Sequence, residues 1–247
     1  MLVNMNSIIP DRVNLRGIMV YPFSNVIDLI DYADSHKGIL VAVNAEKILN
    51  ATEKTREILN NNIAYLDGYG PVKAVRQKGI KDAIRIPGCE LWLEIIKRHH
   101  SDKTFYIIGA KPEVHDQTVS KLKEEFPSLN IVGHRNGYLK DDLDRQALIE
   151  DVAEKKPDVV FVAMGSPRQE ILMSEMYSRH KAIYQGLGGS FDVYTGVAKR
   201  APQWWQDHSM EFVYRLIHQP KRIKRDYKRV KFAWCLLWLA WCWWWRW

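Results

Sequence analysis

The chain has 247 residues, of which 47% are hydrophobic and 26% are charged, and this composition excludes an intrinsically disordered protein. The formal net charge is +7, but residues 215–247 hold nine basic residues and one acidic residue, which leaves 27 basic and 28 acidic residues in positions 1–214. A nucleic-acid-binding enzyme would carry basic residues through its body as well, so we expect no nucleic-acid partner.

Short apolar segments with the character of buried parallel strands recur along the body of the chain. They are β-branched or aromatic, almost continuously apolar, and bounded by Gly, Pro, Asn or Asp. The predicted strands are residues 39–44, 63–67, 104–109, 130–134, 158–165 and 182–188.

Amphipathic segments that alternate with these strands predict helices, some of them with Pro or Asp at the start. The predicted helices are residues 24–36, 45–61, 88–101, 112–126, 141–155 and 167–180. Repeated strand–helix units predict an α/β fold with an open, mostly parallel, Rossmann-like sheet and helices on both faces. We expect this domain to span residues 1–201.

Residues 202–247 are predicted to form a C-terminal helical appendage. Apolar residues recur at steps of three and four from Ile223 to Trp241, flanked by Lys and Arg, and seven of the ten tryptophans lie in the last fourteen residues. The uncharged stretch Phe232–Trp245 has fourteen residues, whereas a membrane-spanning helix needs about 20. We expect this helix to bind an anionic membrane surface. The alternative is a terminal helix that packs on its own domain or in a dimer.

The ends and the cysteines indicate the compartment. Residues 1–17 lack the basic and apolar regions of a signal peptide. The three cysteines, Cys89, Cys235 and Cys242, are odd in number and lack metal-type spacing, which is typical of a reduced cytoplasm.

Polar residues and glycines gather where the predicted strands end. In open α/β sheets, ligands bind outside the carboxyl ends of the strands, and a helix N-terminus after a small-residue turn suits a phosphate or diphosphate. The candidate residues at these ends are Asn44, Asp67, Gly165, Ser166, Gly188, Gly189 and Asp192.

Single motifs have competing interpretations. The segment "GLGGSF" (186–191) is similar to a dinucleotide fingerprint but lacks the third glycine. The segment "DLD" (142–144) is similar to the metal-binding Asp-x-Asp of sugar transferases, but we interpret it as a helix start, where acidic residues favour the dipole. The eight histidines show no ligand spacing. We therefore predict no cofactor and no metal.

Several segments together resemble successive motifs of the WecG/TagA/CpsF glycosyltransferase family, in the family's order, from about residue 15 to about residue 231. They are "VAVNAEKI" (41–48), "YLDGYGPV" (65–72), "FVAMGSPRQE" (161–170), "GLGGSFDVYTG" (186–196), "KRAPQWW" (199–205) and "EFVYRLIHQPKRIKR" (211–225). The segment "LVAVNAEKIL" is most similar to the enterobacterial branch of the family.

The resemblance implies a glycosyltransferase. The enterobacterial branch transfers N-acetylmannosaminuronic acid from UDP to undecaprenyl-diphosphate-linked N-acetylglucosamine, in enterobacterial common antigen synthesis. The TagA branch, the runner-up, transfers N-acetylmannosamine. Either implies a UDP-sugar donor, a lipid-linked acceptor and a peripheral location at the cytoplasmic face of the bacterial inner membrane, and leaves a homo-oligomer open.

The resemblance also implies residue roles. Asp67 matches the family's proposed catalytic base, and a lone base without a partner carboxylate fits an inverting single displacement. Asn44 matches a substrate-binding asparagine and Gln169 an active-site glutamine. Three residues of the appendage match arginines thought to reach the active site: Arg215, Arg222 and Arg225.

The sequence departs from the family pattern at Ala42, where TagA-type members have a threonine, so the hydrogen bond of that threonine is absent. The end beyond residue 231 matches no family motif. A donor carboxylate would need a partner, for which Lys47, Arg85 and Arg168 are unranked candidates.

Two alternatives belong to other classes. A nucleotide-sugar oxidoreductase or epimerase predicts an early Gly-x-Gly-x-x-Gly and a Tyr-x-x-x-Lys pair, and the sequence has neither. A noncatalytic membrane adaptor gives no reason for Asn44, Asp67 and Gln169 all to lie at strand ends.

Overall fold

A computed structural model describes residues 10–199, 201, 202, 204, 205 and 214. The chain divides into two compact units, Met1–Ala198 and Lys199–Trp247. The predicted membrane-binding helix, with Arg215, Arg222 and Arg225, lies outside the described residues. In the second unit, the indole of Trp205 lies 5.7 Å from the rings of both Trp204 and Tyr214.

The first unit alternates strands and helices. The strands are β1 (Val13–Leu15), β2 (Ile18–Val20), β3 (Gly38–Val43), β4 (Ile63–Leu66), β5 (Thr104–Gly109), β6 (Asn130–Arg135), β7 (Val159–Ala163) and β8 (Ile183–Gly186). The helices are α1 (Val26–His36), α2 (Ala45–Asn50), α3 (Glu53–Asn60), α4 (Tyr69–Gln77), α5 (Gly88–His99), α6 (Pro112–Glu125), α7 (Asp142–Lys155), α8 (Arg168–Arg179) and α9 (Ser190–Tyr194).

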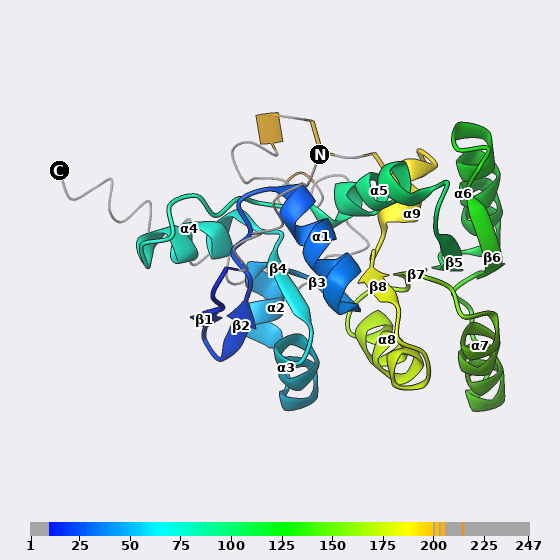
Figure 1. The fold of residues 1–247 in the computed structure, drawn as a ribbon, viewed down its shortest axis with the longest axis horizontal. Helices are drawn as coiled ribbons and strands as arrows, with labels where there is room; N and C mark the ends of the chain where they lie inside the picture. Colours follow the sequence, from blue (N-terminus) through cyan, green and yellow to red (C-terminus); the bar gives the residue numbers. More distant parts are fainter. Residues whose placement is uncertain (1–9, 200, 203, 206–213, 215–247) are drawn as a thin grey trace, which may run out of the picture. The chain divides into compact units, whose positions relative to one another are not determined.

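Six of the strands form one parallel sheet in the order β4-β3-β8-β7-β5-β6, which confirms the predicted open α/β architecture. Every residue of β4, β7 and β8 is buried, which explains their continuous apolarity. Side chains alternate between two core clusters, one on each face of the sheet. Helices α1, α5 and α6 cover one face, and α3, α7 and α8 cover the other (Figure 1).

Two local predictions were wrong. The segment 45–61 is not one helix, because Ala51 is extended (ψ 118°) and the hydroxyl of Thr52 accepts a hydrogen bond from the amide of Thr55 and starts α3. Helix α4 was not among the predicted helices. Pro71 is the third residue of the helix, where its missing N–H has no intrahelical partner.

A short antiparallel hairpin, β1–β2, was also missed. Its two-residue turn, Arg16 and Gly17, has positive φ at both positions (55° and 86°), as hairpin turns with the twist of the strands require. The hairpin leads to Tyr21, which forms a parallel bridge with Tyr65 of β4 and so extends the sheet beyond its edge strand.

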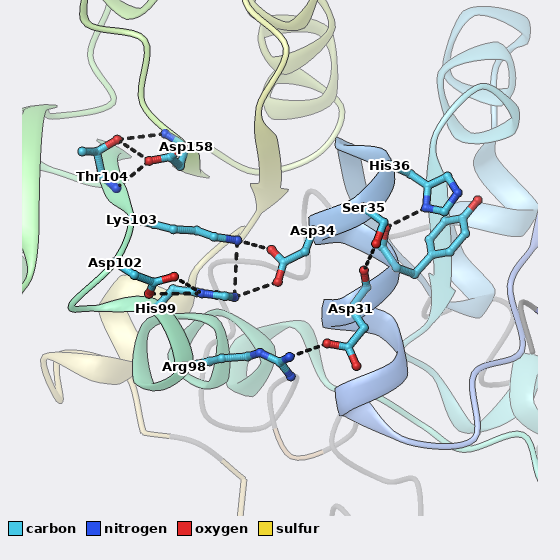
Figure 2. A network of polar contacts seen from close by, with 11 residues as sticks. Asp31, Asp34, Ser35, His36, Arg98, His99, Asp102, Lys103, Thr104 and Asp158 are labelled. Carbon is cyan, nitrogen blue, oxygen red and sulfur yellow. Dashed lines mark hydrogen bonds and ion pairs between the residues drawn. The ribbon is translucent and has the colours of Figure 1, made fainter. Parts of the chain in front are cut away.

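Ion pairs and hydrogen bonds connect α1, α5 and the amino ends of β5 and β7 (Figure 2). His99 at the end of α5 bonds Asp34 of α1 through Nε2 (2.9 Å), and Lys103 pairs with the same carboxylate. Asp158 accepts hydrogen bonds from the amide (2.9 Å) and hydroxyl (2.8 Å) of Thr104. Burial raises the pKa of Asp158, but the bonds from Thr104 outweigh it and leave that pKa below its ordinary value. This edge of the sheet is therefore closed by polar contacts.

Candidate active site

Asn44 and Asp67 lie next to each other at the carboxyl edge of the sheet. Their strands pair in parallel, with Val43 opposite Leu66, so the next residue of each strand is adjacent to the other. The amide of Asp67 donates to the carbonyl oxygen of Val43 (3.0 Å). A side chain at Gly68 would come within 3.2 Å of the Cα of Asn44, so the glycine lets the two strand ends pack closely.

Asn44 caps helix α2. Its Oδ1 accepts a hydrogen bond from the amide of Lys47 (3.0 Å), which fixes the side chain at the strand end. The capping bond uses the oxygen, so the amide nitrogen is the group of Asn44 suited to donate to a ligand.

Asp67 is held at its backbone and at one carboxylate oxygen. Its carbonyl oxygen accepts from Arg85 Nε (2.7 Å), and its Oδ1 accepts from the amide of Gly88 (3.2 Å). Gly88 is the first residue of α5, a helix of twelve residues. The amide at the start of this helix therefore fixes one oxygen of the Asp67 carboxylate.

Buried residues of the sheet hold Gly88, whose amide bonds Asp67, in place. Gln185 of β8 donates through Nε2 to the carbonyl oxygen of Gly88 (3.1 Å). A Cβ at Gly88 would lie 3.0 Å from the hydroxyl of Tyr65 and 3.3 Å from Ala42, so only glycine fits there without displacement. Burial, with a smaller contribution from the charge of Asp67, raises the pKa of Tyr65 well above its ordinary value, so the phenol stays neutral. Ala42, the departure from the TagA pattern, thus packs beside Gly88, whose amide bonds Asp67.

Gln169 joins two loops of the site. Its Oε1 accepts hydrogen bonds from the amides of Gly165 (3.1 Å) and Gly188 (2.9 Å), which follow β7 and β8. Both glycines have positive φ (78° and 58°), and a Cβ at either would meet no atom within 4 Å. At Gly186 an added Cβ would overlap the amide group of Gln169, so the bare strand end makes room for this side chain. Gln169 is 3% exposed, and its contacts position the loops.

A buried ion pair extends this arrangement to β3. Nε2 of Gln169 donates to Oε1 of Glu170 (3.2 Å), and the same oxygen accepts from Nζ of Lys47 (2.7 Å). The carboxylate of Glu170 is 1% exposed. Since Lys47 lies in the helix that Asn44 caps, the polar network connects the loops after β3, β7 and β8.

The remaining candidates lie around the same edge. Ser166 is exposed before Pro167, to which it is joined by a cis peptide bond. Arg168 is exposed at the first residue of α8. Gly189 precedes the short helix α9, and the carbonyl oxygen of Asp192 in that helix accepts from the amide of Ala198 (2.8 Å).

The segment "DLD" starts helix α7, as interpreted from the sequence. Asp141 caps the helix by accepting from the amide of Asp144 (2.8 Å). Both carboxylate oxygens of Asp144 accept hydrogen bonds from the guanidinium of Arg135 (2.9 and 3.0 Å). This pairing lowers the pKa of Asp144 to about 2. Within the described part of the chain, no three His, Cys, Asp or Glu residues gather as metal ligands would.

A cavity that was not found from the sequence lies at the β6 edge of the sheet. It has a volume of about 420 Å³ and includes Arg135 and Asn136 at the end of β6. There Nε2 of His115 (α6) lies 3.0 Å from Nδ1 of His134 (β6). Burial lowers the pKa of His115, and the neighbouring imidazole of His134 lowers it further, by a smaller amount. The two histidines are nineteen positions apart, so no spacing rule pairs them.

Asp67, Asn44 and the glycine loops share one edge of a parallel sheet, and the sequence matches the model of the WecG/TagA/CpsF glycosyl transferase family over residues 13–246. The chain belongs to this family. As a WecG/TagA/CpsF glycosyltransferase, it is a UDP-sugar-dependent enzyme of polysaccharide biosynthesis, with a nucleotide-sugar donor and, in general terms, a lipid-linked acceptor. Among the described helices, none has both the length and the apolar character of a membrane span.

The ion pair beneath this glycosyltransferase site is testable by stability. Lys47→Ala is expected to lower the free energy of unfolding by about 3 kcal/mol, because it leaves the Glu170 carboxylate buried without its cation. Lys97→Ala is the matched control, since Lys97 pairs with Glu94 at the same 2.7 Å but with both side chains about half exposed, and it should cost at most about 0.5 kcal/mol. Chemical denaturation measures both, and equal losses would contradict a structural role for the buried pair.

Proposed function

We propose that this glycosyltransferase moves N-acetylmannosaminuronic acid from its UDP-sugar to undecaprenyl-diphosphate-linked N-acetylglucosamine, with inversion, in enterobacterial common antigen synthesis. The observation that carries the proposal is the adjacency of Asp67 and Asn44 at the carboxyl edge of the sheet, beside the glycine loops after β7 and β8. The similarity of "LVAVNAEKIL" to the enterobacterial branch supports the choice of donor.

In the proposed reaction, Asp67 is the general base. Its carboxylate takes the proton of the acceptor hydroxyl while that oxygen forms the new bond to the anomeric carbon. The bond from this carbon to the diphosphate breaks in the same step, and UDP leaves with the electron pair. One displacement inverts the anomeric centre. The N–H of Gly88, at the start of α5, holds one oxygen of this carboxylate in place.

The glycine loops suit the departing nucleotide. Gly165 and Gly188 present backbone to open space, so a diphosphate can approach without meeting side chains. Helix α8 begins three residues after Gly165 and directs its positive end to the same edge. We assign further stabilisation of the leaving group to Arg215, Arg222 and Arg225 of the appendage, with no metal required.

Contacts in the structure favour one of the candidates for the donor carboxylate. Lys47 is paired with Glu170, and Arg85 holds the main chain of Asp67. Arg168 is exposed at the start of α8 and has no ion pair with any described residue. We therefore assign recognition of the donor carboxylate to Arg168, whose guanidinium can bind both carboxylate oxygens.

A donor panel tests the proposed function. UDP-N-acetylmannosaminuronate, UDP-N-acetylmannosamine and UDP-N-acetylglucosamine are each offered with a lipid-diphosphate-linked N-acetylglucosamine acceptor, with and without chelator. The uronate is expected to give the highest kcat/KM, and Arg168→Gln should reduce it for the uronate alone, by about tenfold or more. Preference for N-acetylmannosamine in the wild type would establish the runner-up activity instead.

The assignment of the base predicts the behaviour of Asp67→Asn. The amide still accepts the hydrogen bond from Gly88 but takes no proton, so kcat should fall by about 10²- to 10⁴-fold while donor binding and thermal stability are retained. Calorimetry with UDP and a transfer assay measure the two effects. Asp142→Asn, at an exposed carboxylate of α7, should behave as wild type, and normal turnover by Asp67→Asn would remove this residue from the reaction.

A peripheral location at the cytoplasmic face of the bacterial inner membrane follows from the proposed acceptor and from the basic, tryptophan-rich end. Replacing Trp243, Trp244 and Trp245 by Ser in the full chain should abolish flotation with anionic vesicles. The variant should keep transfer to a water-soluble, short-chain acceptor, because Arg215, Arg222 and Arg225 are unchanged. Undiminished flotation would instead support packing of the terminal helix on protein.

A further inference from the structure

One side of helix α4 forms a basic groove, defined here by Tyr69, Val72, Lys73, Arg76 and Gln77. These positions follow one another at steps of three, one, three and one, so they share a single stripe of the helix. They border a cavity of about 230 Å³. Helix α4 begins two residues after Asp67 and lies at the β4 end of the sheet (Figure 1). The first residue of the groove, Tyr69, is therefore two positions along the chain from the proposed base.

The groove lies in a region of concentrated positive charge. Residues 69–86 contain five basic residues and one acidic residue, a balance of +4, although residues 1–214 as a whole carry −1. Lys73 and Arg76 are exposed, and Lys73 has no ion pair with any residue that the structure describes. The Nε of Arg76 donates to the carbonyl oxygen of Ala83 (2.9 Å), which orients the guanidinium while four N–H groups remain on its terminal nitrogens.

The charge of the groove selects an anionic occupant. Tyr69 is 54% exposed, so an aromatic side chain accompanies the two cations. A phosphate group that is joined to a sugar or a lipid matches this combination.

The proposed reaction involves two diphosphates, one in the UDP-sugar donor and one in the lipid-linked acceptor, and the order of the strands places them on different sides of β3. The donor's diphosphate belongs with the loops after β8 and β7, on one side of β3, whereas Asp67 and α4 follow β4 on the other side. In a single displacement, the acceptor attacks from the face opposite the leaving nucleotide, so it must approach from the side of β4. Its own diphosphate lies one sugar ring beyond the attacking hydroxyl.

The positions of Lys73 and Arg76 along α4 suit a diphosphate that lies one sugar ring away from the attacking hydroxyl. At 1.5 Å per residue, Lys73 and Arg76 lie about 6 and 10 Å along the helix axis from Tyr69, in the direction away from Asp67. We propose that the basic groove of α4 binds the diphosphate of the lipid-linked acceptor, with Lys73 and Arg76 as its ligands and Tyr69 beside the sugar. This inference rests on the proposed function, because it assigns the second substrate of the same site.

The test compares two acceptors with the full-length enzyme. One is a water-soluble, short-chain lipid diphosphate of N-acetylglucosamine, and the other is an alkyl N-acetylglucosaminide of equal chain length without phosphate. Lys73→Gln should raise KM for the diphosphate acceptor by about tenfold or more and leave KM for the phosphate-free acceptor unchanged. KM for the UDP-sugar should not move. Lys73→Arg should restore most of the loss, and Lys123→Gln, at an exposed lysine of α6, should have no effect.

Each outcome supports or overturns the assignment. Equal changes of KM with both acceptors, or no change with either, would overturn it. If Lys73→Gln impairs transfer only when vesicles of anionic phospholipid are present, the groove binds lipid headgroups and the diphosphate assignment fails. Absence of transfer by the wild-type enzyme would refute the proposed function itself, and this result differs from failure of the groove because the variant and the wild type are measured side by side.

Discussion

The ion pair between Lys47 and Glu170 is the contact on which the geometry of the site depends. Without Lys47 the Glu170 carboxylate would be buried with no cation beside it, and this carboxylate in turn orients the amide of Gln169. Through Gln169, the loops after β7 and β8 acquire fixed backbone positions, and through Lys47 the first turn of α2 does as well. Three loops far apart in the sequence are thus set by one small group of polar side chains.

The two edges of the sheet differ in character. At the amino edge, His99, Lys103 and Asp34 satisfy one another and tie α1 to α5. At the carboxyl edge, by contrast, glycines keep side chains away from the loops, and a carboxylate is stabilised by a helix N-terminus. Gly165 and Gly188 adopt positive φ at this edge, a conformation that glycine reaches without strain because it has no Cβ.

The sequence predicted the sheet well because its central strands are buried on both faces, so apolarity alone marks them, as in β7. It failed where local propensity and context disagree: Pro71 suggests a turn but is harmless in the first turn of α4, and the break at Ala51 depends on a cap by Thr52. Among the candidate site residues, Asn44 and Asp67 were predicted from strand ends and lie together. The internal contacts of Gln169, however, depend on Gly186 and on Glu170, and no periodicity indicates such a tertiary contact.

The bare backbone at Gly186 has a consequence for the spacing of the loops after β7 and β8. Because the amide group of Gln169 lies across that strand end and reaches both loops, the separation of the loops is set by the length of one glutamine side chain. A residue with a shorter side chain at this position could not reach both amides, so the two loops would lose their common hydrogen-bond acceptor.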